Sequence, residues 1–145
     1  MQETEEIIKV LGSPKELSRA GHSLPELVTA TRNGFPATVV PHLSRRLAMD
    51  RKQVTDLVGI ADRTLARRLA GHGVLTALQS DRILRLARIF VFTMDVIGDE
   101  DKAARWLRTP NAAIGGQNPM DLLDTDLGVQ TVTSVLGRIA HGVYS

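Results

Sequence analysis

The sequence predicts an all-α fold in which a helix-turn-helix module packs on a small C-terminal helical domain. Apolar residues recur at helical spacing through almost all of the 145 residues, and this period is the main signal of amphipathic helices. Capping residues and glycines divide the pattern into separate helices. We find no convincing strand and no internal repeat. The elements are therefore expected to be helices joined by short loops.

The N-terminal segment, residues 1–34, is predicted to be helical and partly mobile. Ser23 is a suitable N-cap for a short helix, since its hydroxyl can accept a backbone hydrogen bond, and Gly34 ends that helix. A second helix is predicted over 37–47. Pro41 lies inside this span, so the helix could instead begin there.

A module with two further helices is predicted within residues 35–76. Asp50 is expected to cap a helix that Gly59 ends, and Asp62 is expected to cap the next one, which ends near Gly71 or Gly73. These residues stand where a helix-turn-helix would place its caps and its turn.

A long helix is predicted over 77–97, within a segment that we bound at 77–98. Its first half is amphipathic, but residues 89–94 are apolar nearly all round. Such a helix is buried on several sides, either in a core or in a subunit interface. Both interpretations stay open at this point.

The C-terminal segment, residues 99–145, is predicted to hold a helix over 99–107, a helical turn at Pro119–Leu123 and a last helix over 126–141. Asp124 or Asp126 is expected to cap the last helix. The apolar residues of this helix are Leu127, Val132, Val135, Leu136 and Ile139.

Composition excludes several classes of protein. The chain has no cysteine, which excludes disulfides, thiolate zinc sites and a cysteine nucleophile. The four histidines lie too far apart for metal ligation, so we expect no metal. We also expect no cofactor and no enzymatic activity. No apolar run reaches about 18 residues, the length of a membrane span. The polar N-terminus does not resemble a signal peptide, so a cytoplasmic protein is expected.

Charge is segregated along the chain, although the formal net charge is only +2. Residues 42–94 hold ten basic and four acidic residues, whereas residues 95–145 hold four basic and seven acidic ones. The basic segment could face DNA, because phosphate contacts supply most non-specific affinity for nucleic acids. It could equally be a solvated basic face. The acidic end would be repelled by DNA and is free to bind another partner.

Residues 52–69 have the order of a helix-turn-helix motif. Gly59 would make the sharp turn, and the second helix would present polar and basic side chains to the major groove. The two helices would be held together by apolar residues, namely Val54, Val58, Ile60, Leu65 and Leu69. Thr55 stands where the motif usually has alanine. An ordinary αα-hairpin with a basic surface is the alternative interpretation.

We predict that DNA is contacted by Lys52, Arg63, Thr64, Arg67 and Arg68. Arg63 and Thr64 lie near the N-terminus of the second helix, which normally reaches phosphates and base edges. Arg67 is expected at a base edge, since arginine can fork onto guanine O6 and N7. Lys52 is expected at a flanking phosphate. Paired operator half-sites would require a homodimer, which the apolar half of the long helix could form.

The C-terminal third carries the most distinctive motifs, at Trp106-Leu107, Pro110-Asn111, Gly115-Gly116, Pro119–Leu123, Thr125–Gly128 and Arg138–Gly142. This set closely resembles the toxin-binding domain of the Xre/MbcA/ParS-type antitoxins, and the ParS branch above all. Ile114 stands where leucine is usual. The upstream segments Gly59–Leu69 and Ser80–Arg88 also look like this family, so the resemblance covers about residues 35–145.

The resemblance implies the antitoxin half of a bacterial type II toxin–antitoxin system. The cognate toxin usually carries a RES domain, an ADP-ribosyltransferase-like fold that uses NAD, and the antitoxin's C-terminal region covers the NAD-binding cleft. Members also tend to dimerise and to bind their own promoter. The implied partners are a RES-domain toxin, operator DNA and a second copy of this chain. A stand-alone helix-turn-helix regulator without a toxin is the alternative.

The resemblance assigns toxin binding to Trp106, Asn111, Gly115, Gly116 and Arg138, and to the C-terminal residues Val143, Tyr144 and Ser145. Tyr144 is a rigid amphipathic side chain that could enter a pocket, or it could belong to a frayed end. Trp106 could instead be a core residue that fixes the turn after it. The acidic segment suits a cleft that binds an anionic dinucleotide, because such a cleft should be electropositive.

Overall fold

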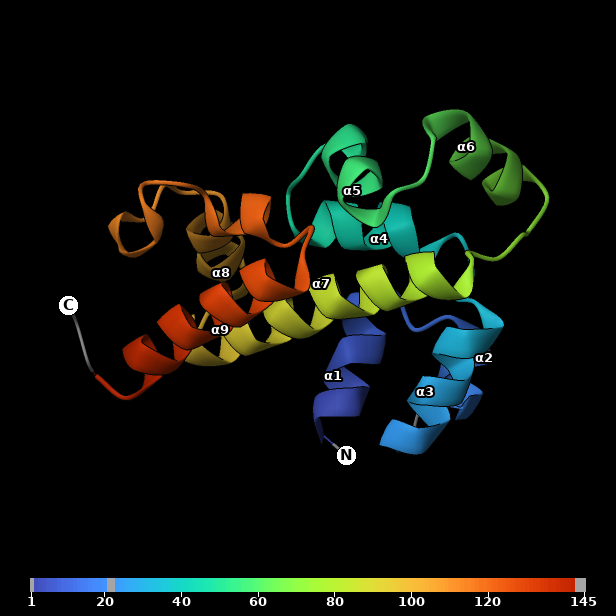
Figure 1. Ribbon diagram of the computed structural model, residues 1–145. Coiled ribbons are helices and arrows are strands. Elements are labelled where there is room, and N and C mark those ends of the chain that lie inside the picture. The colour runs from blue at the N-terminus through green and yellow to red at the C-terminus, as the bar shows by residue number, and fades with distance from the viewer. Residues whose placement is uncertain (1, 21–22, 143–145) are drawn as a thin grey trace. The chain divides into compact units, whose positions relative to one another are not determined.

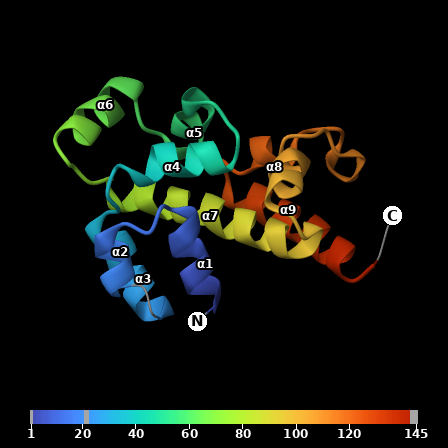
Figure 2. The same cartoon turned by 180° about the vertical axis from the view of Figure 1, so that it is seen from behind.

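The structure is a computed structural model that describes residues 2–20 and 23–142 (Figures 1 and 2). The regular elements in these residues are helices, and two isolated β-bridges join Pro36 to Val74 and Asn111 to Gln117. The predicted all-α fold is therefore confirmed. The chain divides into two compact units, Met1–Ala87 and Arg88–Ser145.

The first unit is built around the first half of a long helix, α7 (Ala77–Ile97). Helices α1, α2 and α3 lie on one side of this half, and α4 and α5 lie on the other (Figures 1 and 2). The bounds of the preceding helices are α1 Gln2–Val10, α2 Lys15–Ala20, α3 Leu24–Asn33, α4 Val39–Arg46, α5 Arg51–Val58 and α6 Asp62–Ala70. The largest side chains that are fully buried in this unit are Ile7, Leu11, Leu17, Phe35, Leu43, Leu47, Leu65, Leu75 and Ile83.

Proline is accommodated in α4 because the helix begins later than expected. It starts at Val39, so Pro41 lies in the first turn, where N–H groups have no partner within the helix and a proline costs little. The prediction of a start at Ala37 is wrong. The amide of Ala37 instead donates to the carbonyl of Gly73 at 3.0 Å.

Hydrogen bonds link the segment before α4 to the segment before α7 and to the first turn of α7. The amide of Leu75 donates to the carbonyl of Phe35 at 2.8 Å, and the amide of Phe35 donates to the buried hydroxyl of Ser80 at 2.8 Å. Gly34 has a φ of 96°, and a Cβ at this position would collide with the carbonyl oxygen of Leu75. These contacts fix the place where the helix-turn-helix module joins α7.

The half-buried ring of His42 makes the first unit sensitive to acid. Burial, followed by the nearby guanidinium groups of Arg45 and Arg46, lowers the pKa of His42 below its usual value. Arg45 Nη2 lies 3.4 Å from His42 Nδ1, and the ring lies against Gly12. The folded state therefore disfavours the imidazolium relative to the unfolded chain.

The stability that comes from neutral His42 is present above the usual histidine pKa of about 6.5 and is lost as the pH falls below it. We expect wild-type Tm to fall between about pH 7.5 and pH 5 by roughly 1–3 °C more than the Tm of His42→Gln. Thermal unfolding followed by circular dichroism at the two pH values measures this. Equal losses in both proteins would contradict it, because the carboxylates titrate alike in both.

The second unit contains four further elements besides the rest of α7. Its elements are α8 (Glu100–Leu107), the 3-10 turns η1 (Ala112–Ile114) and η2 (Pro119–Leu122), and α9 (Asp126–Ala140). Both α8 and α9 pack against η2. The buried side chains of the unit include Phe90, Ala103, Ala104, Leu107, Met120, Leu123, Val132, Val135 and Leu136.

Both α8 and α9 begin with a side-chain cap. Asp99 caps α8, and its carboxylate accepts from the amide of Lys102 at 2.9 Å. The last helix is capped by Thr125, whose hydroxyl accepts from the amide of Gly128 at 3.0 Å. The prediction of Asp124 or Asp126 is wrong, because the residue between them has the extended backbone that an N-cap requires.

The apolar half of α7 is largely part of a core within the single chain. Ile89, Phe90, Val91 and Thr93 are buried, and the hydroxyl of Thr93 donates to the carbonyl of Ile89 at 2.6 Å. Other apolar residues of this half are only half-buried, namely Phe92, Met94, Val96 and Ile97. Within the described part of the chain, α7 and the other helices lack the combination of length and apolar character that spanning a bilayer requires.

Candidate functional site

The first unit contains a helix-turn-helix formed by α5, the turn after it and α6. Asp50 and Gln53 form a capping box at the start of α5, with hydrogen bonds of 2.9 and 3.1 Å. Gly59 ends the helix in the left-handed conformation, at a φ of 78°. The apolar residues predicted to hold the two helices together are buried, namely Val54, Val58, Ile60 and Leu65, while Leu69 is half-buried.

Thr55 fits the motif although alanine is usual at its position. Its side chain is buried, and its hydroxyl donates to the carbonyl of Lys52 at 3.0 Å. A buried hydroxyl costs free energy only when it lacks a partner. The hydroxyl of Thr55 has a hydrogen-bond partner within one turn of α5, so threonine is tolerated at this position.

The start of α6 differs from the sequence-based expectation. Ala61 is the N-cap, without a side-chain capping hydrogen bond, and Asp62 is the first helical residue. The prediction that Asp62 caps α6 is thus wrong. Its carboxylate instead lies 3.2 Å from Arg51 Nε, which links the two helices of the motif at the surface.

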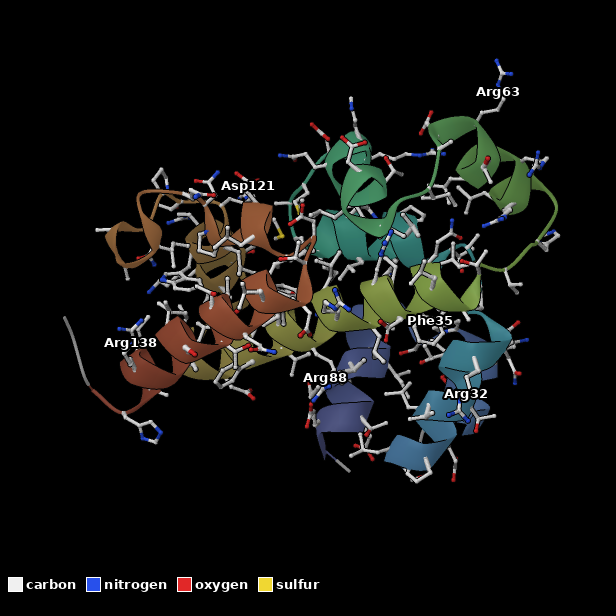
Figure 3. The ribbon with its side chains drawn as sticks, viewed as in Figure 1. Arg32, Phe35, Arg63, Arg88, Asp121 and Arg138 are labelled. Carbon is white, nitrogen blue, oxygen red and sulfur yellow. The ribbon has the colours of Figure 1, made fainter. Side chains whose placement is uncertain are left out.

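Three of the predicted DNA-contacting residues lie together on α6. Arg63 and Arg67 are exposed and one helical turn apart, and Thr64 is half-buried beside them. Arg63 extends away from the helix into solvent (Figure 3). Neither guanidinium group is engaged by another residue of α5 or α6. Both can therefore donate hydrogen bonds to base edges or phosphates.

The other two predicted DNA-contacting residues already have partners within the chain. Arg68 is half-buried, and its Nη1 donates to Gln79 Oε1 at 2.7 Å. Lys52 Nζ lies 2.9 Å from Asp56 Oδ2, and this hydrogen bond raises the pKa of Lys52. An exposed ion pair of this kind is weak, so Lys52 remains available to a phosphate.

In the second unit, three of the predicted toxin-binding residues lie in one loop. The side chain of Asn111 accepts from the amide of Ala113 at 2.9 Å, and its carbonyl accepts from the amide of Gly116 at 2.9 Å. Gly115 and Gly116 have φ values of 72° and 80°, in the left-handed region that favours glycine. The loop is therefore held by its own backbone and is exposed at its glycines.

The remaining predicted toxin-binding residues lie elsewhere in the unit. Trp106 is half-buried near the end of α8, and Arg138 is exposed near the end of α9 (Figure 3). Val143, Tyr144 and Ser145 lie outside the described residues.

The structure also reveals an exposed apolar residue in the first turn of α9. Leu127 is 72% exposed, whereas the buried stripe of α9 consists of Gly128, Val132, Val135 and Leu136. The buried stripe begins at Gly128, one position later. Three exposed carboxylates, Asp121, Asp124 and Asp126, stand close to Leu127 in sequence, and we call these four residues the acidic edge.

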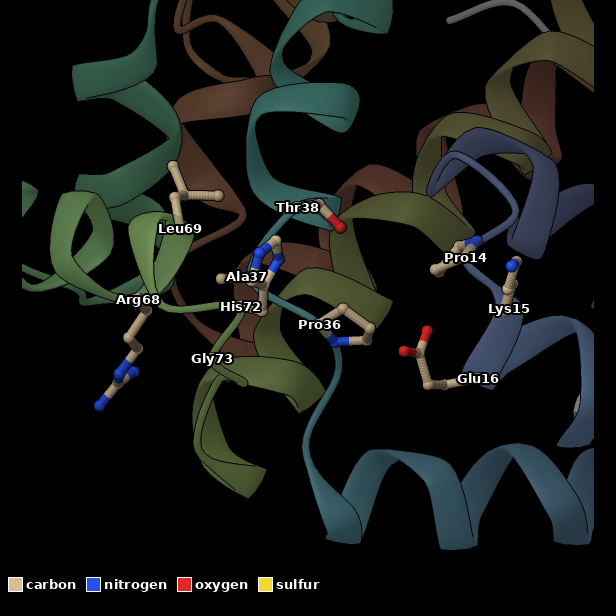
Figure 4. A pocket seen from close by; sticks show the side chains of 10 residues that line it. All are labelled: Pro14, Lys15, Glu16, Pro36, Ala37, Thr38, Arg68, Leu69, His72 and Gly73. Atoms are coloured by element: carbon tan, nitrogen blue, oxygen red, sulfur yellow. The ribbon is translucent and has the colours of Figure 1, made fainter.

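A cavity of about 200 Å³ lies in the first unit beside the end of α6 (Figure 4). Its walls include Lys15, Glu16, Thr38, Arg68 and His72. Lys15 and Glu16 are both exposed and have opposite charges, and Arg68 is held by Gln79. The lining therefore carries charges of both signs. Within residues 2–20 and 23–142, no group of three or more His, Cys, Asp or Glu side chains could hold a metal ion.

Known proteins match both halves of this arrangement. Residues 26–88 match the model of the antitoxin Xre-like helix-turn-helix domain, and residues 92–142 match that of the antitoxin Xre/MbcA/ParS C-terminal toxin-binding domain. Antitoxin Xre of Photorhabdus laumondii subsp. laumondii is 34% identical over 122 residues, which cover 83% of this chain and 82% of that protein. The chain belongs to the Xre/MbcA/ParS family of antitoxins.

Two further relatives widen the comparison for this antitoxin. The Prs ADP-ribosylating antitoxin of Sphingobium sp. is 28% identical over 140 residues, covering 90% of this chain and 87% of that protein. One chain of the crystal structure of the M. tuberculosis MbcT–MbcA toxin–antitoxin complex superposes with a TM-score of 0.56 at 28% identity, covering 75% of this chain and 96% of that one. The prediction of an antitoxin of a toxin–antitoxin system with a helix-turn-helix domain is confirmed.

Proposed function

We propose that this antitoxin neutralises a RES-domain toxin that uses NAD, by covering the toxin's active-site cleft with its second unit. We further propose that it represses its own operon through the helix-turn-helix of its first unit. In this proposal the antitoxin acts by steric masking and charge complementarity, without catalysing a reaction itself. The observation that carries the proposal is the match of residues 92–142 to a toxin-binding domain.

The comparisons support a toxin that handles ADP-ribose. The relative from Sphingobium carries ADP-ribosylation in its name, and NAD is the usual donor of ADP-ribose in that reaction. The structural neighbour belongs to a toxin–antitoxin complex. A cognate toxin encoded beside this antitoxin is therefore the partner we propose.

The acidic edge has the chemistry that such a cleft requires. A site that binds an anionic dinucleotide must present positive charge, so exposed carboxylates on the partner would both attract it and orient it. Asp121, Asp124 and Asp126 supply these charges, and Leu127, which follows them in the sequence, supplies an apolar side chain that is 72% exposed. An apolar anchor surrounded by polar residues is the common arrangement of a protein interface.

The exposed face of α6 supports operator binding. Arg63 and Arg67 are exposed on the same helix face, and Thr64 lies beside them. We propose that a homodimer presents two copies of α6 to paired half-sites, with the half-buried apolar residues of α7 as candidate dimer contacts. Sedimentation of the purified antitoxin as a monomer at micromolar concentration would contradict the dimer.

The test of neutralisation removes the last three residues, Val143, Tyr144 and Ser145. We expect the truncated antitoxin to bind the toxin about 30-fold more weakly, because a buried aromatic anchor contributes about 2 kcal/mol to an interface. Toxin from the adjacent reading frame is mixed with each antitoxin, and NAD consumption or ADP-ribose transfer is measured against antitoxin concentration. The matched control is Arg63→Ala/Arg67→Ala, which should inhibit the toxin as wild type does.

The outcomes separate the parts of the proposal. If the truncated antitoxin inhibits fully, the last three residues do not enter the cleft. The cleft must then be masked by residues 88–142 of the second unit. If the full chain forms no complex with the neighbouring protein but binds its promoter, it is a stand-alone regulator. Turnover of NAD by the purified antitoxin alone would contradict the absence of catalysis.

A further inference from the structure

The start of α7 carries a capping box with an additional function. Thr76 precedes the helix, and its hydroxyl accepts from the amide of Gln79 at 3.1 Å. Gln79 Oε1 accepts from the amide of Thr76 at 3.1 Å. These two reciprocal hydrogen bonds satisfy orphan amides at the helix start, which is all that a capping box requires of its glutamine.

The side chain of Gln79 makes two more contacts, both with the helix-turn-helix. Its Oε1 also accepts from Arg68 Nη1 on α6 at 2.7 Å. Its Nε2 donates to the carbonyl of Gly59 in the turn at 3.4 Å. One amide group thus joins the start of α7, the turn and the second helix of the motif.

Arg82 holds the same turn from one helical turn further along α7. Its Nη1 donates to the carbonyl of Val58, the last residue of α5, at 3.1 Å. The guanidinium lies so close to Gly59 that a Cβ at that glycine would collide with Nη1. A cation suits this position, because the last carbonyls of a helix lack partners and carry partial negative charge.

The buried apolar contacts of α6 are few. Leu65 is the one residue of α6 that is fully buried, and the helix has no side-chain cap at its start. A helix anchored chiefly by one buried side chain can pivot about it. The hydrogen bonds from Gln79 and Arg82 act on the turn before α6 and on Arg68 near its end, so they restrict that pivot at both ends.

We propose that Gln79 and Arg82, which we call the α7 clamp, are positioning residues that hold α6 in the orientation that reads operator DNA. This rests on the proposed function of operon repression. The clamp does not touch DNA in this proposal. It acts through Gly59 and Arg68, and it leaves Arg68 with donors that are free to reach a phosphate.

The test uses two variants of the full-length antitoxin, Gln79→Leu and Arg82→Met. Affinity is measured for the antitoxin's own promoter fragment and for an unrelated duplex of equal length, each over a range of salt concentrations. We expect each variant to bind the promoter at least about tenfold more weakly and the unrelated duplex within about twofold of wild type, because base readout depends on helix orientation and non-specific binding does not. The salt dependence should not change, since no phosphate contact is lost.

Conservative variants and a matched control separate positioning from general stability. Gln79→Glu keeps the acceptor for Arg68 and for the amide of Thr76, and Arg82→Lys keeps one donor toward Val58, so both should recover most of the promoter affinity. Arg85→Met removes a guanidinium from the same helix, where it pairs with Asp81 at 3.4 Å, and should bind the promoter as wild type does.

Several outcomes would overturn the clamp. Promoter affinity equal to wild type in both Gln79→Leu and Arg82→Met would show that α6 needs no such restraint. An equal loss on both duplexes, or no recovery by Gln79→Glu, would show a merely structural role. The two variants remove different contacts, so either one tests the proposal if the other fails to fold. If wild type itself binds no promoter DNA, operon repression fails first and the clamp with it, whereas a failure of the variants alone overturns only the clamp.

Discussion

Gly128→Ala is expected to destabilise the second unit by about 3 kcal/mol or more, which is a large part of the stability of a small unit. Gly128 lies in the first turn of α9 and is buried. A Cβ there would collide with the carbonyl oxygen of Leu122 and would lie 2.7 Å from its carbonyl carbon. These are backbone atoms, so no side chain can rotate away to make room, and η2 or α9 must move.

Movement of either element would break contacts that hold the unit together. The amide of Gly128 donates to the capping hydroxyl of Thr125, which lies 3.0 Å from the position of the added Cβ, and loss of an N-cap costs about 1 kcal/mol by itself. The turn η2 packs against both α8 and α9, and its Met120 is buried. A displacement at Gly128 is therefore transmitted to the core of the unit.

Gly137→Ala, on the same helix, is the matched control. A Cβ at Gly137 would meet no atom within 4 Å, and alanine stabilises a helix interior by about 0.5–1 kcal/mol relative to glycine. The same chemical change should thus lower Tm at one position of α9 and raise it at the other. Thermal and urea unfolding followed by circular dichroism measures both, and shifts of the same sign would contradict the role of Gly128.

The local parts of this fold could be predicted from the sequence. Ser23 and Asp50 cap the helices that they were expected to cap, and Gly59 takes the left-handed conformation expected of the turn. Each of these depends on a few neighbouring residues, because a cap bonds to an amide three positions away and a glycine turn needs only its own backbone freedom. The C-terminal motifs predicted the family for a different reason, since many matched positions stand together.

The errors concern the exact residue at which a helix begins. Asp62 and Asp126 are good capping residues, but the adjacent residues, Ala61 and Thr125, have the extended backbone of an N-cap. Leu127 fits a helical period, but the buried stripe begins one position later. Sequence periodicity cannot make this choice, because the first turn of a helix contains few residues from which to judge its buried face.

The parts of the candidate site that could not be predicted depend on contacts across the turn. The hydrogen bond of Arg68 to Gln79 spans 11 residues, and that of Gln79 to Gly59 spans 20. Polar side chains on amphipathic helices are expected to be solvated, so Gln79 and Arg82 give no sign of these contacts in the sequence. The pattern instead predicted an outward-facing Arg68.

Arg63→Ala/Arg67→Ala is expected to bind the antitoxin's own promoter at least about 100-fold more weakly than wild type, because each arginine that contacts a base or phosphate contributes about 1–3 kcal/mol. Both side chains are exposed and stand one turn apart on α6. Gel shift or fluorescence anisotropy with the promoter fragment measures the affinity. Lys102→Ala/Arg105→Ala removes two exposed cations from α8 in the second unit, and this control should leave promoter affinity unchanged.

The salt dependence of the single variants distinguishes the contacts that the two arginines make. An arginine on a phosphate releases counterions, so its removal should lower the slope of log affinity against log salt by about 0.9. An arginine on a guanine edge leaves that slope nearly unchanged but relaxes the preference for one base pair. We expect the second behaviour for Arg67→Ala, and promoter affinity equal to wild type in the double variant would contradict α6 as the recognition helix.

Because the helix-turn-helix and the acidic edge lie in different units, the same double variant should still inhibit the toxin. Loss of both activities would show that the two surfaces are not separate.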